Sequence, residues 1–134
     1  MLDENRLSDF RPHALAALRI MTALLFIQHG TQKFFGFPAE FPMDLNALMW
    51  LAGLLELVGG LLILVGLFTR PTAFILCGFM AAAYFMGHAP QGFFPLVNQG
   101  ELAVLYCFVF LYLFFAGPGS FSVDEMRAGK PAMG

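Results

Sequence analysis

Charge is what this sequence most clearly lacks. Only 12% of its 134 residues are Asp, Glu, Lys or Arg, whereas soluble domains carry about 25%. Hydrophobic residues make up 59% of the chain and gather in four apolar stretches. A backbone embedded in lipid must satisfy its hydrogen bonds within helices or closed barrels, and no ten-residue alternation typical of a barrel is present. The composition therefore argues against a soluble domain and predicts an all-α integral membrane protein.

Cysteine and cofactor motifs are also scarce. Cys77 and Cys107 stand thirty positions apart within apolar segments, and there is no C-x-x-C pair. We interpret them as buried small hydrophobic residues, with a redox pair as the alternative. No haem-attachment motif, metal-ligand spacing or Rossmann glycine pattern occurs, so we predict no metal. With a net charge of −2 the chain lacks the excess of basic residues typical of nucleic-acid binding. No small-residue cleavage site follows the first apolar run, so we expect no removable signal peptide.

The length suggests one domain, residues 1–134, organised as a four-helix bundle. Pro12 suits the first turn of a helix, Asp44 is a candidate N-cap, and the turn at 68–71 makes the second and third helices a hairpin. Gly117 and Pro118 end the last apolar run. The predicted helices cover residues 14–34, 45–67, 71–87 and 99–116.

The distribution of basic residues predicts the orientation. Four spans place both termini on one side of the membrane, and the short flanks on that side hold all but one of the basic residues outside the helix interiors. Because Lys and Arg favour the cytoplasmic side, we expect both termini in the cytoplasm of a bacterium and the two remaining loops facing outward. Those residues are Arg6, Arg11, Arg70, Arg127 and Lys130, against Lys33 on the outer side.

Aromatic residues cluster at the predicted outer boundary. They suit anchoring at the membrane interface, and the alternative is a flat pocket for a quinone or lipid ring. The cluster contains Phe34, Phe35, Phe37, Phe41, Trp50, Phe93 and Phe94.

Ionisable residues inside spanning helices are costly and mark functional sites. The topology brings His29, Lys33, His88 and Glu101 to one outer level, and we predict that they converge, with Asn98, into one polar ligand site roofed by the 91–99 loop. Each residue also has a structural explanation. Lys33 can extend to the headgroups, His88 can end a helix at water, and Asn98 with Glu101 matches a capping box.

Glu56 lies deeper, near the middle of the second predicted helix. Gly53 and Gly60 share its face, so another helix can approach closely there. We predict an intramembrane ion pair between Arg19 and Glu56, because either charge alone would be unpaired in the bilayer. The alternative is a Glu56 that passes protons to a quinone site.

Three segments of the chain resemble the DoxX family of small four-helix bacterial membrane proteins. They are LRIMTALLFIQHGTQKFFGF, ELVGGLLILVGLFTRPTAF, and the stretch from AYFMGHAPQGFFPLVNQGEL to the glycines after residue 116. The resemblance covers residues 14–119. Its most specific parts are His29-Gly30-x-x-Lys33, the segment from Glu56 to Gly60 with Thr69-Arg70, and the stretch from Gly-Phe-Phe-Pro (92–95) to Gly-Glu (100–101). It implies a protein of the bacterial cytoplasmic membrane with a connection to redox enzymes or quinones, and it assigns no reaction.

Three functions follow as hypotheses. The first is a quinone-linked redox subunit, in which His29 and His88 bind the quinone carbonyls, Lys33 supplies charge, and Glu101 or Glu56 supplies protons. The second is a non-catalytic module that anchors or assembles a redox enzyme, and the third is a binding protein for a lipid or small hydrophobic molecule. Quinone is the candidate cofactor, and haem between the two histidines is disfavoured. Candidate partners are membrane lipid, a redox-enzyme subunit and a second copy of the chain, without nucleic acid.

Overall fold

The computed structural model describes residues 3–129, and Lys130 of the predicted cytoplasmic flank lies outside them. Those residues contain helices and no strand. All four predicted helices are confirmed, and their observed ends lie within three residues of the predicted ones. In chain order the elements are α1 (Glu4–Asp9), α2 (Arg11–Phe35), α3 (Ala47–Leu54), the π-helical η1 (Leu55–Gly59), α4 (Gly60–Val65), α5 (Thr69–Gly87), the 3-10 helix η2 (Ala89–Gln91), α6 (Pro95–Asn98), α7 (Glu101–Ala116) and α8 (Val123–Arg127).

Three of these helical stretches are long and apolar enough to cross a membrane. They cover Arg11–Phe35, Ala47–Val65 and Thr69–Gln91. The fourth, Glu101–Ala116, has 16 residues and is about 24 Å long at 1.5 Å per residue, somewhat less than a bilayer core of about 30 Å. A crossing by α7 therefore requires little tilt together with local thinning of the bilayer or flanking residues that extend the span.

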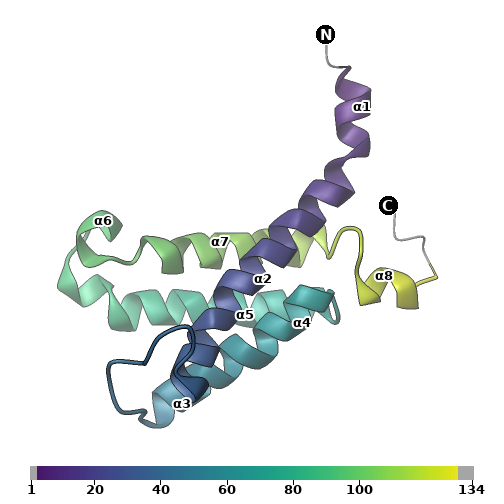
Figure 1. Cartoon of the computed structure of the whole chain (residues 1–134). Coiled ribbons are helices and arrows are strands. Elements are labelled where there is room, and N and C mark those ends of the chain that lie inside the picture. The colour runs from purple at the N-terminus through teal and green to yellow at the C-terminus, as the bar shows by residue number, and fades with distance from the viewer. Residues whose placement is uncertain (1–2, 130–134) are drawn as a thin grey trace.

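The helices form two antiparallel pairs (Figure 1). α2 packs along α3, η1 and α4, and α5 packs along α7. We call the left end in Figure 1 the loop end, because it holds the 36–46 and 88–100 connections. We call the opposite end the terminal end, because it holds α1, the turn between α4 and α5, and α8. Both described ends of the chain thus lie on the same side of the bundle, as four crossings require.

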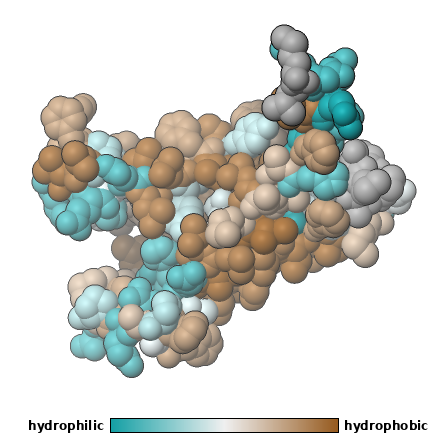
Figure 2. Space-filling model, turned by 45° about the horizontal axis from the view of Figure 1, so that its top comes forward, coloured by the Kyte–Doolittle hydropathy of each residue, from teal (hydrophilic) through white to brown (hydrophobic). Residues whose placement is uncertain are grey.

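The interior of the bundle is small and partly aromatic. Phe26 and Phe110 are buried, and their ring centroids lie 5.1 Å apart in an edge-to-face contact. Tyr106 meets Phe26 at 5.2 Å in the same way. The outward side chains of the spans are apolar too, and Figure 2 shows hydrophobic surface over the middle of the molecule with hydrophilic residues at its ends. This distribution fits a lipid environment around the helices.

The second span is not a regular α-helix. Its central turn, Leu55–Gly59, is π-helical, which the sequence analysis did not predict. Single π-turns inside α-helices widen the backbone locally and occur frequently at functional sites. The N-cap prediction for this span was wrong as well. Asn46, two residues after Asp44, accepts the capping hydrogen bond from the Met49 N–H at 2.9 Å, because the helix begins later than expected.

Side chains from elsewhere in the fold cap the helices at the terminal end. The Asp124 carboxylate accepts hydrogen bonds from the N–H groups of Phe68 and Thr69, at 2.8 and 2.9 Å, where α5 begins. Arg70 donates to the last carbonyls of α7, those of Phe114 and Phe115. Burial tends to raise the pKa of Asp124, but the two backbone N–H groups and a nearby arginine outweigh that and hold it below the usual range. The tail after α7 is thereby fixed to the turn between α4 and α5.

Candidate ligand site at the loop end of the bundle

A cavity of about 290 Å³ opens between α2, η1, α5 and α7 near the loop end. Its volume is at the lower limit for small-molecule sites, which suits one ring or headgroup better than a whole lipid. Its walls combine apolar side chains with five polar ones. The apolar lining is Phe26, Met80, Ala83, Leu102 and Ala103, and the polar lining is His29, Glu56, His88, Gln99 and Tyr106.

Glu56 forms an ion pair with Lys33 at the edge of this cavity. The Lys33 Nζ lies 2.8 and 3.0 Å from the two carboxylate oxygens, and the side chains are only 11% and 8% exposed. The same ammonium lies 5.2 Å from the centre of the Phe41 ring, a cation–π distance. A buried pair of this kind neutralises both charges and leaves the carboxylate facing the cavity.

Glycines bring the two paired helices close enough for this contact. A Cβ on Gly30 would lie 2.9 Å from the Leu57 nitrogen and 3.0 Å from the Gly53 oxygen, so backbone packs directly on backbone. On the other helix, a Cβ on Gly53 would contact Phe34 and Lys33, and one on Gly60 would contact Ile27 at 2.5 Å. The predicted role of the glycine face around Glu56 is confirmed, and its partner is α2.

The predicted pair between Arg19 and Glu56 was wrong. Arg19 is completely buried at the terminal end and donates to the carbonyl oxygens of Pro118, Ser120 and Phe121. Its side chain extends toward the tail after α7 and away from the middle of the membrane. Sequence spacing determined neither the direction of the Arg19 side chain nor the fold of the tail. The three carbonyl acceptors of Arg19 and the lysine partner of Glu56 were therefore missed.

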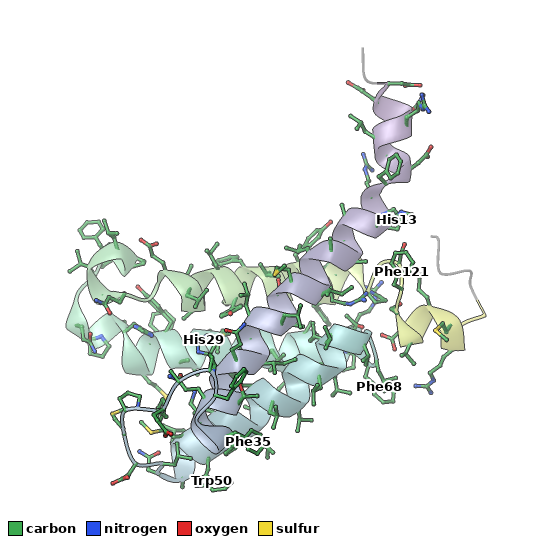
Figure 3. The ribbon with its side chains drawn as sticks, in the orientation of Figure 1. His13, His29, Phe35, Trp50, Phe68 and Phe121 are labelled. Atoms are coloured by element: carbon green, nitrogen blue, oxygen red, sulfur yellow. The ribbon has the colours of Figure 1, made fainter. Side chains whose placement is uncertain are left out.

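His29 and Tyr106 meet inside the cavity. Their ring centroids are 6.0 Å apart with planes at 87°, an edge-to-face contact between α2 and α7. His29 is half-buried, and Figure 3 shows it on the part of α2 nearest to the loop end. Tyr106 is buried, and its hydroxyl has no protein hydrogen-bond partner among the contacts of residues 3–129. The cavity therefore offers an imidazole and a phenol to a ligand.

His88 reaches the same cavity from the end of α5. Its Nδ1 lies 3.1 Å from the Asn98 backbone oxygen, so Nε2 is the nitrogen left for a ligand. The ring also stacks on Tyr84 with centroids 6.4 Å apart. The structure thus brings His29 and His88 to one cavity, and Lys33 joins them through its pair with Glu56.

Asn98 and Glu101 do not line the cavity, contrary to prediction. The Asn98 side chain is buried, donates to Tyr84 and the Gly92 oxygen, and accepts from the Gly100 N–H at 2.8 Å. Its amide holds the 92–100 segment in place, with no group left for a ligand. Glu101 is exposed at the first position of α7. The expected capping box is absent because α6 ends at Asn98 and Gly100 becomes the N-cap of α7.

The aromatic cluster predicted at the outer boundary lies at the loop end, but it does not line the cavity. Phe34 packs on Trp50 with ring centroids 4.8 Å apart, while Phe35 and Trp50 are largely exposed at the lower left of Figure 3. Phe93 is 86% exposed. These positions fit interfacial anchoring, and the aromatic walls of the cavity come from Phe26 and Tyr106 instead.

A larger cavity of about 720 Å³ lies at the terminal end. Its charged lining includes Arg70 and Asp124, which are already engaged in capping α7 and α5. Figure 3 shows His13 and Phe121 facing each other nearby, with ring centroids 5.7 Å apart. We interpret this cavity as a gap where α2, α5, α7 and α8 meet, with a structural role.

Within residues 3–129, no group of three or more His, Cys, Asp and Glu side chains lies close enough to hold a metal ion. Among the polar features of the loop-end site, sequence reasoning missed Tyr106 and the π-helical turn around Glu56, whereas Gln99 belongs to the loop predicted as the roof. No sequence pattern links Tyr106 to His29 and Phe26, because Tyr106 lies on α7, which meets α2 only through tertiary packing.

Comparison with known proteins agrees with this architecture. The DoxX family profile matches residues 14–89, which include His29, Lys33, Glu56 and His88. An uncharacterized protein of Haemophilus influenzae is 47% identical over 128 residues, covering 90% of this chain and 96% of that protein. The inner membrane protein YqjF of Escherichia coli is 34% identical, with 84% and 90% covered. An uncharacterized membrane protein of Mycobacterium tuberculosis is 28% identical, with 90% and 85% covered. No solved structure matches.

The apolar spans and the polar cavity between them define an all-helical membrane protein with a buried ion pair beside a ligand-sized site. The chain belongs to the DoxX family.

Proposed function

We propose that this chain is a quinone-linked subunit of a redox system in the bacterial cytoplasmic membrane, and that the loop-end cavity binds the polar ring of the quinone. The observation that carries the proposal is the Lys33–Glu56 pair, held in the membrane beside two histidines and open to the cavity. Charges in spanning helices are costly, and this pair has volume in front of it that a ligand can fill.

The chemistry of the lining fits a quinone ring. His29 and His88 enter from different helices, and the neutral imidazole of His29 can donate to a carbonyl oxygen. The Nδ1–H of His88 donates to the Asn98 oxygen, so its Nε2 can accept from a hydroxyl of the reduced quinol. The Tyr106 hydroxyl is a further donor, and the Lys33 ammonium stabilises negative charge that develops on the ring. Glu56 is the group that can take up or release a proton within the cavity. A bound quinone accepts two electrons and two protons, and the electrons come from a partner protein.

Two observations support the proposed location. One relative is named an inner membrane protein, and the basic flanks lie at the terminal end of the bundle. We therefore place the termini in the cytoplasm and the cavity in the outer leaflet. Alkaline phosphatase fused at Ala39 is expected to be active, and the same enzyme fused after Gly134 inactive. An active fusion after Gly134 contradicts this orientation.

Binding of decylubiquinone to purified protein in nanodiscs tests the function directly. We expect saturable binding that weakens about tenfold in His29→Ala, because one lost hydrogen bond is worth about 1.4 kcal/mol, a factor of ten in affinity. His29→Ala with His88→Ala should further weaken binding of the reduced form, decylubiquinol, whose hydroxyl can donate to His88 Nε2. Gln91→Ala is the matched control, since its side chain bonds only to the Gly87 oxygen outside the cavity. Full binding by the double variant contradicts the proposal. Absence of binding in the wild type favours the non-catalytic module, and a different co-purified lipid favours the binding-protein hypothesis.

A further inference from the structure

The two cysteines of the chain lie against each other across the α5–α7 interface. Their sulfur atoms are 3.7 Å apart, and both thiols are free. From the sequence we favoured buried small hydrophobic residues over a redox pair, and the structure places the two sulfurs in van der Waals contact. A disulfide requires the sulfurs at roughly 2.05 Å, so the two side chains must rotate toward each other to form one.

The register of the two helices holds the thiols together. Gly100 packs on the Tyr84 ring, Cys107 meets Cys77, and the Phe114 carbonyl accepts from Arg70. Each contact is seven residues from the next on both helices, the spacing at which antiparallel helices keep one seam in contact. The cysteine pair is the central contact of this seam, so it is fixed by the packing on either side.

The pair lies at a depth that water-soluble reagents do not reach. Cys77 is near the middle of α5 and Cys107 near the middle of α7. Both are half-buried, and the neighbouring Gly78 is exposed with no other atom within 4 Å of its Cβ position. The surface at Gly78, the neighbour of Cys77 in the chain, is therefore open, and both cysteines are themselves partly exposed. A molecule dissolved in the bilayer can approach the sulfurs there.

We propose that Cys77 and Cys107 form a redox-active dithiol that passes two electrons to a quinone dissolved in the bilayer. Both S–H bonds break and one S–S bond forms. The two electrons and two protons released convert the two carbonyls of the quinone to the hydroxyls of the quinol. The dithiol is a separate site from the loop-end cavity, and its reaction does not require binding there.

The test uses reduced protein in liposomes and two oxidants. Decylubiquinone partitions into lipid, and its fully substituted ring forms no stable thiol adduct, whereas glutathione disulfide stays in water. After denaturation, free thiols are counted by the gel shift from a polyethylene glycol maleimide. Wild-type protein is expected to lose both thiols to the quinone, to form one quinol per chain, and to keep both thiols with glutathione disulfide.

Single-cysteine variants are the matched controls. Cys77→Ser and Cys107→Ser are each expected to keep their one thiol after quinone treatment and to form no quinol. His29→Ala with His88→Ala is expected to oxidise like the wild type, which separates this proposal from quinone binding at the cavity. Retention of both wild-type thiols after quinone treatment overturns the proposal. Equal oxidation by glutathione disulfide, or failure of the histidine variant to oxidise, overturns direct access from the lipid.

Discussion

Arg19 and Lys33 are two buried basic residues of the same helix, and they have different surroundings. Arg19, at the terminal end, is completely buried and donates to three backbone carbonyls of the tail. Lys33, at the loop end, pairs with a carboxylate that faces a cavity. A buried charge therefore points to a ligand site only when open volume lies in front of it. Arg19 has a structural role, and Lys33 belongs to the candidate site.

The side chains suit these two roles. The planar guanidinium of arginine presents five N–H donors in a fixed geometry, which allows one residue to serve several carbonyls. The lysine ammonium is a compact charge on a flexible stem, which matches a single carboxylate. Lys33 also remains close to its own helix, since its Nζ is 3.5 Å from the His29 oxygen.

The largest expected effect is that of Arg19→Ala. One buried and two part-buried carbonyls lose their donor, and each unpartnered acceptor at this partial burial costs about 1–2 kcal/mol, so the free energy of unfolding should fall by about 3–6 kcal/mol. Thermal or denaturant unfolding in detergent measures it. Arg11→Ala, at an exposed position of the same helix, is the control and should change stability by less than about 0.5 kcal/mol. Equal effects of the two substitutions would remove the structural role of Arg19.

Glu56→Gln should have the next largest effect, a loss of about 3 kcal/mol, because it leaves the Lys33 charge buried without a counter-ion. Lys33→Met combined with Glu56→Gln should recover most of that loss. Arg19→Gln combined with Glu56→Gln should be additive, because the two residues are not in contact. The unfolding free energies of the single and double variants give both coupling energies. If the double variant with Arg19→Gln recovered stability and the one with Lys33→Met were additive, Arg19 and not Lys33 would be the partner of Glu56.

Gly30→Ala should cost about 1–3 kcal/mol, because the added methyl meets backbone of the facing helix at 2.9 and 3.0 Å. Separation of the helices should also weaken the Lys33–Glu56 contact. Gly78→Ala is the matched control, since its added methyl meets nothing within 4 Å and alanine favours a helix by up to about 1 kcal/mol. Melting temperatures of the two variants measure the difference. Similar destabilisation by both would show that close helix contact is not what matters at Gly30.

Asp124→Asn should have the smallest effect, about 1 kcal/mol near neutral pH, through weaker capping of α5. The pKa of Asp124 is lowered in the folded protein, so its stabilising effect is complete above the ordinary carboxyl pKa of about 3.9. It is lost as the pH falls through the lower folded value. Unfolding measured across this acid range should show the wild-type and variant curves converging. A difference that persists unchanged at the lowest pH contradicts the role of the Asp124 charge.

The spans and the family were predictable because each depends on local sequence. Apolar runs bounded by Pro12, by the 68–71 turn and by Gly117 predicted the four helices to within three residues. The glycine face around Glu56 predicted close helix packing, which the structure confirms. Motifs between residues 14 and 119 carried the family resemblance, and the family match covers residues 14–89 of that stretch.

The partners of the buried charges were not predictable from spacing. Depth along a helix placed Arg19 within reach of Glu56, but the direction of the arginine side chain depends on how the tail after α7 folds back. The π-helical turn that contains Glu56 has no sequence signature that we could use. Contact between Cys77 and Cys107 depends on the register of α5 against α7. The two cysteines are thirty positions apart, and that spacing alone does not specify the register.

Decylubiquinone binding to the Lys33→Met, Glu56→Gln double variant tests the central claim most directly. This variant removes both charges together, so it should fold with nearly wild-type stability and keep the apolar walls of the cavity. If the pair belongs to a ligand site, the variant should bind the quinone at least tenfold more weakly than the wild type despite its stability. Full affinity in this stable variant would contradict the account and give Lys33 the same structural role as Arg19.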